Sequence, residues 1–247
     1  DKILENGLAI AERAGLQVRK AKGAEHGTAD ASAQPAMTDA QRDEALHHGM
    51  ELVKGLPGNA LLLGEMGIGN TSAASLLLSR LAGLDIAVCT GAGTGLDAPA
   101  VQRKTAVLRE VLERHVDATA PLDALAALGG FEIATMVGAV LQAAVERRVI
   151  VVDGFIATSA VVVAHALQPL VLQRCVFAHR SGERGHEFML QHLGVRALLD
   201  MGLRLGEGSG AALAWPLLQS ACTILRDMAS FAQAGVSEKS AGTEVAA

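Results

Sequence analysis

Short apolar runs alternate with longer segments of helical periodicity along most of the 247-residue chain. Apolar positions that recur at helical spacing are typical of helices, whereas a short apolar run bounded by turn residues is typical of a buried strand. The runs predict strands at 60–63, 86–89, 149–152 and 171–177. The periodic segments predict helices at 1–22, 38–54, 70–81, 98–114, 131–147, 156–167, 190–201 and 209–232.

The start of the second predicted helix carries a specific signal. Thr38 precedes it and Gln41 follows at the spacing of a capping box, in which each side chain bonds the backbone of the other residue. Before this helix, segment 23–37 is built from small and polar residues and predicts a loop. After the last helix, the small and polar tail from Ser237 predicts a frayed end.

Short, largely apolar strands that alternate with helices predict an α/β fold with a parallel sheet covered on both faces. Crossovers between parallel strands are right-handed, so the turns that follow the strands gather at one edge of the sheet. Ligands of such sheets bind at that edge. The glycine-rich turns after the predicted strands are therefore the candidates for a binding site.

The first of these turns is GEMGIGNTS at 64–72, which follows a predicted strand and opens a predicted helix. Glycines there free the backbone N–H groups of the helix start to bind phosphate. The turn is not a P-loop, because no lysine precedes Thr71 and Ser72, and Ser72 also replaces the third glycine of a dinucleotide fingerprint. Taken alone, it fits phosphate binding and a tight structural turn equally well.

A second glycine-rich turn, TGAGTGLD at 90–97, follows the next predicted strand and precedes the next predicted helix. Two glycine loops at neighbouring strand ends favour an anion site more than either loop does alone. Lys104, on the helix that follows, is one of few cations near this edge, although a single lysine is more often a solvated surface charge.

The segment HRSGERGH at 179–186 allows two interpretations. His179 and His186 are candidate metal ligands, but no third ligand follows at a suitable spacing. An anion-binding loop that uses Ser181 and Gly182, with Arg180 as a further candidate, is the favoured interpretation.

Two acidic residues are candidates for chemistry. Glu207 stands between glycines and near Leu203 and Leu205. It either helps to cap the helix that follows, or acts as a base whose proton affinity is raised by burial against the leucines. Asp153 ends the strand at 149–152, where a carboxylate either contacts ribose hydroxyls or serves only the turn.

Composition narrows the class of protein. The formal net charge is −5, and the chain has no basic run, no zinc-finger spacing and few aromatic residues, so we expect no nucleic-acid partner. The chain contains no stretch of about 20 apolar residues, so the sequence predicts no membrane span. The three cysteines lie far apart without metal spacing, which favours buried free thiols and a cytoplasmic location. Because the chain begins with Asp1, we expect a fragment or a processed form of a longer protein.

The motifs together resemble one family, the nicotinate-nucleotide–dimethylbenzimidazole phosphoribosyltransferases. Several blocks occur in the same order in that family: GEMGIGNTSAASLL (64–77), TGAGTGLD (90–97), LGGFEIATMVGAVLQAA (128–144), VVDGFIATSA (151–160), HRSGERGH (179–186) and LLDMGLRLGEGSGAALAWPLL (198–218). The resemblance covers about residues 35–237, and its ordered blocks are far more specific than any single glycine loop. Family members carry a sizeable N-terminal portion before this point, so the resemblance implies an N-terminally truncated member.

The resemblance also implies an architecture. A Rossmann-like, three-layer α/β domain at 56–188 would bind the nucleotide. A small helical subdomain would come from the chain ends, with an N-terminal helical segment at 1–55 and C-terminal helices at 189–236 that carry the catalytic glutamate, followed by a flexible tail at 237–247. The family further implies a homodimer.

The implied reaction transfers a phosphoribosyl group from nicotinate mononucleotide to 5,6-dimethylbenzimidazole. The products are nicotinate and α-ribazole 5′-phosphate, the precursor of the lower ligand of cobalamin. The family's catalytic glutamate falls on Glu207, and Glu65 matches a second active-site acid. The remaining implied site residues contact phosphate or ribose, or line the base pocket: Gly67, Ile68, Gly69, Asn70, Thr71, Gly91, Gly93, Thr94, Gly95, Lys104, Asp153, Ser181 and Gly182, and then Leu203 and Leu205.

Metal and cofactor are expected to be absent. The paired acidic residues of phosphoribosyltransferases that use a diphosphate donor do not occur at any predicted strand end. A mononucleotide donor has no diphosphate to chelate, so a metal-free reaction is coherent. Two alternatives remain open from the sequence: a related phosphoribosyltransferase with another azole, purine or phenolic acceptor, and a non-catalytic nucleotide-binding fragment.

Overall fold

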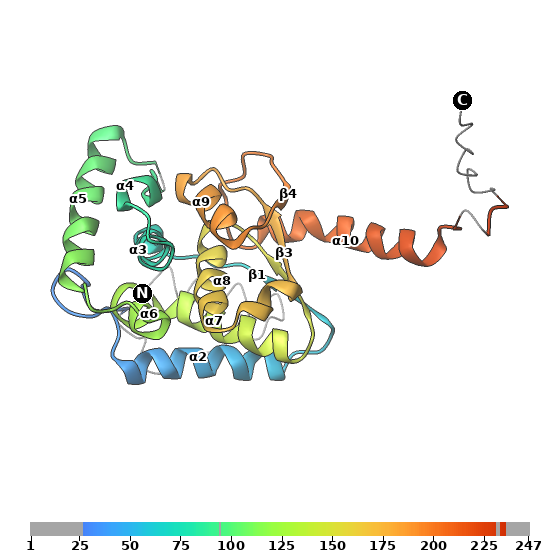
Figure 1. The fold of residues 1–247 in the computed structure, drawn as a ribbon, viewed down its shortest axis with the longest axis horizontal. Coiled ribbons are helices and arrows are strands. Elements are labelled where there is room, and N and C mark those ends of the chain that lie inside the picture. The colour runs from blue at the N-terminus through green and yellow to red at the C-terminus, as the bar shows by residue number, and fades with distance from the viewer. Residues whose placement is uncertain (1–26, 94, 231–232, 236–247) are drawn as a thin grey trace, which may run out of the picture.

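The computed structural model describes residues 27–93, 95–230 and 233–235 (Figure 1). The helix predicted at 1–22, Thr94 and the tail from Ser237 lie outside these residues. The elements follow in the order α2 (Asp39–Lys54), β1 (Ala60–Leu63), α3 (Asn70–Ala82), α4 (Ile86–Cys89), α5 (Ala98–Arg114), α6 (Pro121–Leu128), α7 (Phe131–Val145), β2 (Val149–Val152), α8 (Phe155–Leu167), the 3₁₀ helix η1 (Pro169–Arg174), β3 (Cys175–His179), α9 (Arg184–Leu193), β4 (Ala197–Leu199) and α10 (Ser209–Asp227).

The strands form one parallel sheet in the order β1-β2-β3-β4. The register aligns the strand ends, because Leu63 pairs with Val152 and Val152 pairs with Phe177. The segments that leave β1, β2, β3 and β4 therefore start from the same edge, as the sequence predicted.

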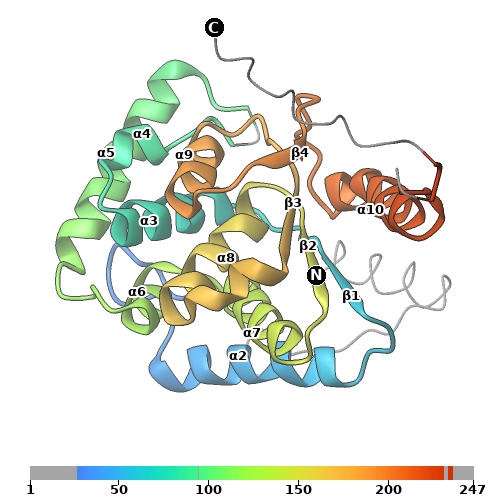
Figure 2. The same ribbon diagram turned by 45° about the vertical axis from the view of Figure 1, so that its right-hand side comes forward.

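Helices cover both faces of this sheet. Figures 1 and 2 show α7 and α8 on one face and α10 on the other. Successive side chains of a strand point to opposite faces. Val152 and Phe177 accordingly join the main core, whereas Val151 and Ala178 pack with Ala211 and Ala214 of α10. The predicted three-layer α/β fold is confirmed.

The helix α2 packs along α7 beneath the sheet (Figure 1). The predicted capping box is present, since Thr38 accepts from the Gln41 backbone and the Gln41 side chain accepts from the Thr38 backbone. Contact with α7 depends on glycine in both helices. A Cβ on Gly49 would lie 1.9 Å from the carbonyl oxygen of Thr135, and one on Gly138 would lie 1.9 Å from that of Leu46.

The strand predicted at 86–89 is wrong, because this segment is the short helix α4. Asp85 caps it by accepting a hydrogen bond from the N–H of Ala87, and the Thr90 hydroxyl donates to the Ile86 carbonyl. A four-residue apolar run has no periodicity that separates a strand from a helix. Local capping by polar neighbours therefore decided the outcome.

The predictions around the last two strands also need correction. Segment 171–177 is not one strand, because η1 occupies its first part and β3 begins only at Cys175. The helix predicted at 190–201 starts earlier and ends at Leu193, where Gly194 adopts a φ of 67° and β4 follows. Left-handed glycine is a common helix terminator. No element was predicted between 114 and 131, where the helix α6 (Pro121–Leu128) lies.

Within the described residues, no helix is both long and apolar enough to cross a membrane. The thiols differ in their surroundings. Cys89 is buried and Cys175 is partly buried, whereas Cys222 is exposed on α10, so the expectation of buried thiols is wrong for Cys222.

The close approach of α2 and α7 generates a stability prediction. Replacing glycine by alanine in a helix normally adds about 1 kcal/mol of helix propensity. At Gly138 the new methyl would collide with the Leu46 carbonyl, so we expect Gly138→Ala to lower the free energy of unfolding by about 1–3 kcal/mol. Urea unfolding followed by circular dichroism measures this. Ser220→Ala, on the exposed part of α10, is the control and should stay within about 0.5 kcal/mol. Increased stability of Gly138→Ala would contradict the packing argument.

Candidate active site

A cleft of about 250 Å³ lies at the edge of the sheet where the strands end. The segments that leave β1, β2 and β3 contribute to its lining, together with the segment that precedes α10. These segments are far apart in the sequence, so the parallel register is what brings them together. The side chains discussed below that line it are Glu65, Asn70, Thr71, Asp153, His179, Ser181, Glu183, Arg204, Leu205 and Glu207.

The turn between β1 and α3 supplies an anion-binding feature. Gly69 precedes α3 with a φ of 87°, and no side chain of the described residues caps this helix. Its first N–H groups carry the positive end of the helix dipole and attract anions. Lys104 of α5 donates to the Thr71 hydroxyl over 2.9 Å, which adds a cation beside the same turn. Burial lowers the pKa of Lys104, while the Glu183 carboxylate opposes that change.

The predicted residues of this turn do not all face the cleft equally. Gly67, Ile68, Asn70 and Thr71 line it. Ile68 is 90% exposed, so its side chain is open to solvent. The turn thus offers its backbone rather than an apolar wall.

The second glycine loop is held by a charged pair that the sequence analysis did not assign. Arg204 donates to the Gly93 carbonyl over 2.9 Å and to Glu183 over 3.2 Å, and Glu183 accepts from the Gly93 N–H over 3.3 Å. A Cβ on Gly91 would lie 2.3 Å from the Glu183 carboxylate, so a side chain there would displace that carboxylate from the loop. Gly93 lines the cleft, and Gly95 is exposed with a φ of 123°.

The backbone amides of the third loop already have partners inside the protein. The N–H of Ser181 donates to His186 over 2.8 Å, and the N–H of Gly182 donates to the Leu203 carbonyl over 3.2 Å. The Ser181 side chain lines the cleft. Of the groups in this loop that were predicted to bind an anion, the Ser181 hydroxyl is therefore the one best placed.

Glu65 lies in surroundings that strongly raise its pKa. Burial raises the pKa of Glu65 to about 7, and the carboxylates of Glu132, Asp153 and Glu207 add to this, against a hydrogen bond donated by the Asn70 side chain. A carboxyl group with such a pKa is partly protonated near neutral pH. It can then both donate and accept hydrogen bonds in the cleft.

Glu207 has a strained backbone and an open side chain. Its φ is 61°, between Gly206 at 77° and Gly208 at 79°, and left-handed backbone is uncommon for a residue with a side chain. Its N–H donates to the Glu65 carbonyl over 3.1 Å, which joins the two acidic segments. The side chain is exposed, Leu205 is 73% exposed, and Leu203 is partly buried outside the cleft lining. The shielding of Glu207 by these leucines, expected from the sequence, is not present in this structure.

Asp153 contacts the start of α10. Its carboxylate accepts from the N–H of Gly208 over 3.2 Å and from the N–H of Ala211 over 3.0 Å. Burial alone would raise the pKa of Asp153, but His179 and the Ala211 amide outweigh it and lower the pKa. These contacts favour the structural interpretation of Asp153, although the residue also lines the cleft.

Sequence reasoning gave no role to three residues in or beside the cleft. Glu183 and Arg204 line it, and Glu132 acts on the pKa of Glu65. All three lie inside the blocks quoted above, but the sequence did not show which groups they would contact. His179 was weighed as a metal ligand, yet in the described part of the chain no group of three potential ligand side chains is placed to hold a metal ion.

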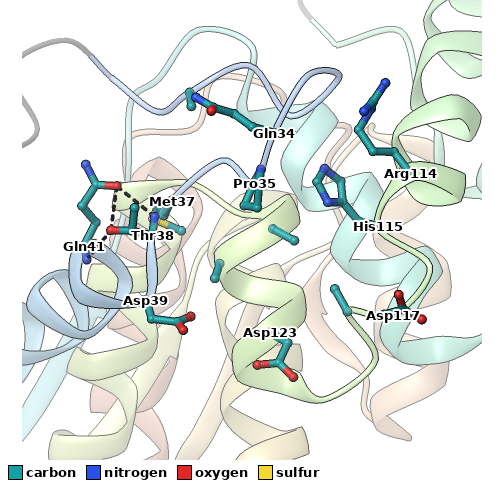
Figure 3. A pocket seen from close by; sticks show the side chains of 14 residues that line it. Gln34, Pro35, Met37, Thr38, Asp39, Gln41, Arg114, His115, Asp117 and Asp123 are labelled. Carbon is teal, nitrogen blue, oxygen red and sulfur yellow. Dashed lines mark hydrogen bonds between the residues drawn. The ribbon is translucent and has the colours of Figure 1, made fainter.

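A larger cavity of about 720 Å³ lies elsewhere and shares no residue with the cleft (Figure 3). It lies between the start of α2, the end of α5 and α6. Its charged side chains stand near helix ends that they stabilise, such as Asp39 and Asp123 in first turns and Arg114 in a last turn. The Thr38 and Gln41 side chains bond each other (Figure 3). Nothing in this lining converges on one ligand, so the cleft at the sheet edge is the candidate site.

The raised pKa of Glu65 is directly measurable. A carboxyl titration by ¹³C NMR should give a midpoint of about 7 for Glu65. Glu132→Gln should lower that midpoint, because it removes a neighbouring negative charge, whereas Glu110→Gln on the exposed face of α5 should not. Since the folded protein holds this proton more tightly than the unfolded chain, the contribution of Glu65 to stability should fall as pH rises from 4.5 to about 7. An ordinary midpoint would contradict this account of the cleft.

Comparisons with known proteins agree with this geometry. A sequence model of a phosphoribosyltransferase family matches residues 4–236. The nicotinate-nucleotide–dimethylbenzimidazole phosphoribosyltransferase of Variovorax paradoxus strain S110 is 70% identical over 213 residues, which are 86% of this chain and 61% of that protein. The enzyme of the same name from Ralstonia nicotianae is 54% identical over 216 residues, again 86% of this chain and 61% of that protein.

A solved structure shows the same fold. The crystal structure of CobT from Thermus thermophilus superposes with a TM-score of 0.83 at 38% identity, covering 91% of this chain and 67% of the other. The chain spans about 61% of the length of the two relatives above. The ordered sequence blocks, the parallel sheet and these similarities together show that the chain belongs to the nicotinate-nucleotide–dimethylbenzimidazole phosphoribosyltransferase family.

Proposed function

We propose that the protein transfers the phosphoribosyl group of nicotinate mononucleotide to 5,6-dimethylbenzimidazole, giving α-ribazole 5′-phosphate and nicotinate for the lower ligand of cobalamin. The observation that carries the proposal is the composition of the cleft. The uncapped start of α3 and Lys104 form an anion site, and Glu65 and Glu207 line the same cleft. A donor phosphate and an acceptor base that loses a proton need this combination.

The chemistry requires little acid catalysis. The pyridine ring of the donor is a cation before the glycosidic bond breaks and neutral afterwards, so nicotinate leaves without being protonated. The acceptor nitrogen attacks the sugar carbon, and the other ring nitrogen gives up its proton. One base at that N–H is sufficient, and holding both substrates in line supplies much of the remaining acceleration.

Glu207 is the residue we assign as this base. Its carboxylate is open to the cleft, so an acceptor can reach it. A solvated carboxylate is a weak base. An aromatic acceptor that lies against exposed Leu205 would displace water from the carboxylate and strengthen it as a base. The acceptor would then supply the shielding that the leucines alone do not provide.

Glu65 is assigned a supporting role at the sugar. Its raised pKa allows a protonated or charged form near neutral pH. The charged form stabilises positive charge that builds at the sugar carbon as nicotinate leaves, and either form can hold a ribose hydroxyl.

The donor phosphate is assigned to the N-terminal end of α3. The turn before α3 lines the cleft, the Lys104 ammonium donates to Thr71 at the start of that helix, and Ser181 lines the same cleft. The loop that contains Gly91, Gly93 and Gly95 closes the same side, and Arg204 and Glu183 fix its shape.

We also propose that the protein works as a homodimer in the cytoplasm. Large apolar side chains of α10 are exposed in the described chain, including Leu213, Leu217, Ile224 and Leu225, and such a surface is typical of an interface. Figure 1 shows the second half of α10 extending away from the sheet. Light scattering coupled to size-exclusion chromatography measures the mass in solution, and a monomeric mass would contradict the proposed homodimer.

The activity test measures both products. The protein is incubated with nicotinate mononucleotide and dimethylbenzimidazole, and nicotinate and α-ribazole 5′-phosphate are quantified by mass spectrometry. Equal release of both supports the proposal. Reaction of another azole, purine or phenol while dimethylbenzimidazole stays inert would show that the acceptor is a different molecule. Tight nucleotide binding without nicotinate release would indicate a binding protein.

Glu207→Gln should separate chemistry from binding. The amide keeps the size of the side chain but cannot take the azole proton, so we expect at least about a tenfold loss in kcat with unchanged donor affinity. Glu187→Gln, which alters an exposed carboxylate of α9, is the matched control. Full activity of Glu207→Gln would remove this residue from the base role.

Lys104→Ala should instead weaken binding of the donor, nicotinate mononucleotide. Loss of a charged hydrogen-bond donor beside the phosphate position should raise the dissociation constant of nicotinate mononucleotide at least about tenfold. Calorimetry measures this, with Lys54→Ala as the control, because Lys54 pairs with Glu51 on the surface of α2. An unaltered donor affinity would refute the phosphate site.

A further inference from the structure

The first turn of α10 is capped by a residue of another element. Gly208 occupies the N-cap position and has no side chain with which to cap the helix. Asp153, directly after β2, takes its place, with one carboxylate oxygen on the N–H of Gly208 and the other on the N–H of Ala211. Hydrogen bonds from amides to a carboxylate at a helix start are among the stronger ones in proteins.

The buried ring of His179 lies beside this carboxylate. The ring is 2% exposed, and its Nε2 lies 3.6 Å from the Asp153 carboxylate. In the described part of the chain, neither ring nitrogen has a hydrogen-bond partner, and the Asp153 carboxylate forms an ion-pair contact with the ring only if His179 is protonated.

Glycines on two sides make room for the ring. A Cβ on Gly210 would lie 1.9 Å from the His179 ring, and one on Gly154 would lie 3.1 Å from it. The ring therefore fills the space between the start of α8 and the start of α10. This packing leaves the Asp153 carboxylate little freedom to move away from the α10 amides.

The turn that Asp153 clamps is the one that carries Glu207. Gly206, Glu207 and Gly208 all have positive φ, so this backbone needs external contacts to keep its shape. One contact is the hydrogen bond from the Glu207 N–H to the Glu65 carbonyl. Another is the close approach of Gly64 to Gly208, where a Cβ on Gly64 would lie 2.4 Å from the Gly208 nitrogen. The third is Asp153 itself.

We propose that Asp153 is a positioning residue whose carboxylate, confined beside the buried His179 ring, clamps the first turn of α10 and thereby sets where the Glu207 carboxylate stands in the cleft. The clamp itself follows from the contacts above, and its catalytic consequence rests on the proposed function. Asp153 then acts through Glu207 and not by contact with the sugar.

Hydrogen exchange tests the clamp without reference to activity. In Asp153→Asn the amide can offer one oxygen but turns an N–H toward a backbone N–H. We expect the Gly208 and Ala211 amides to exchange at least about tenfold faster, while the β2 and β3 amides stay protected. His179→Gln should give a smaller increase at the same amides. Asp85→Asn, which changes a helix cap away from the cleft, is the matched control. Unchanged exchange at Gly208 and Ala211 would overturn the proposal.

Kinetics then separate positioning from sugar binding. A positioning role predicts a lower kcat with an unchanged donor KM in Asp153→Asn, and little further loss when Glu207→Gln is added. A higher donor KM with unchanged kcat would assign Asp153 to the ribose and reject the positioning role. If the wild-type protein shows no turnover, the proposed function fails while the exchange experiment still decides the clamp. If Asp153→Asn does not fold, His179→Gln carries the same exchange test.

Discussion

The parallel register of the four strands is the constraint on which the rest of this molecule depends. Because Leu63, Val152 and Phe177 lie in line across the sheet, the residues that follow them emerge together at one edge. Glu65, Asp153 and Ser181 leave different strands and still line one cleft. The layer of helices on each face leaves this edge as the place where backbone and polar side chains stay open to a ligand.

The cleft combines positive groups that can bind a phosphate with carboxylates that can act on the sugar and the acceptor base. A chain with a net charge of −5 can attract an anion only through local positive groups, and the start of α3 and Lys104 supply them. Beside them lie carboxylates, with Glu132, Asp153 and Glu207 all raising the pKa of Glu65. A bound phosphate would add further negative charge, so Glu65 would hold its proton more tightly in the complex with donor than in the free protein.

Glycines in this fold not only form turns but also allow close contacts that a Cβ atom would prevent. Gly64 and Gly208 let two backbone segments of the cleft approach, Gly91 admits the Glu183 carboxylate, and Gly210 admits the His179 ring. Helices α2 and α7 use Gly49 and Gly138 in the same way. The high glycine content of the chain is therefore explained partly by contacts between elements that are distant in the sequence.

The sequence by itself determined the elements with strong local signals. The capping box at Thr38 and Gln41, the strands 60–63 and 149–152, and the glycine turn 64–72 after the first strand all followed from residues that lie next to one another. Only the tertiary structure decided the rest. The four-residue run 86–89 became a helix through its Asp85 cap, and both Glu207 and the neighbouring Leu205 lie open to solvent. The hydrogen bonds of Asp153 with Gly208 and Ala211, and the ion pair of Glu183 with Arg204, form only in the folded chain. The reason is physical: periodicity and caps act over a few residues, whereas burial and hydrogen-bond partners depend on segments that meet only when the sheet has formed.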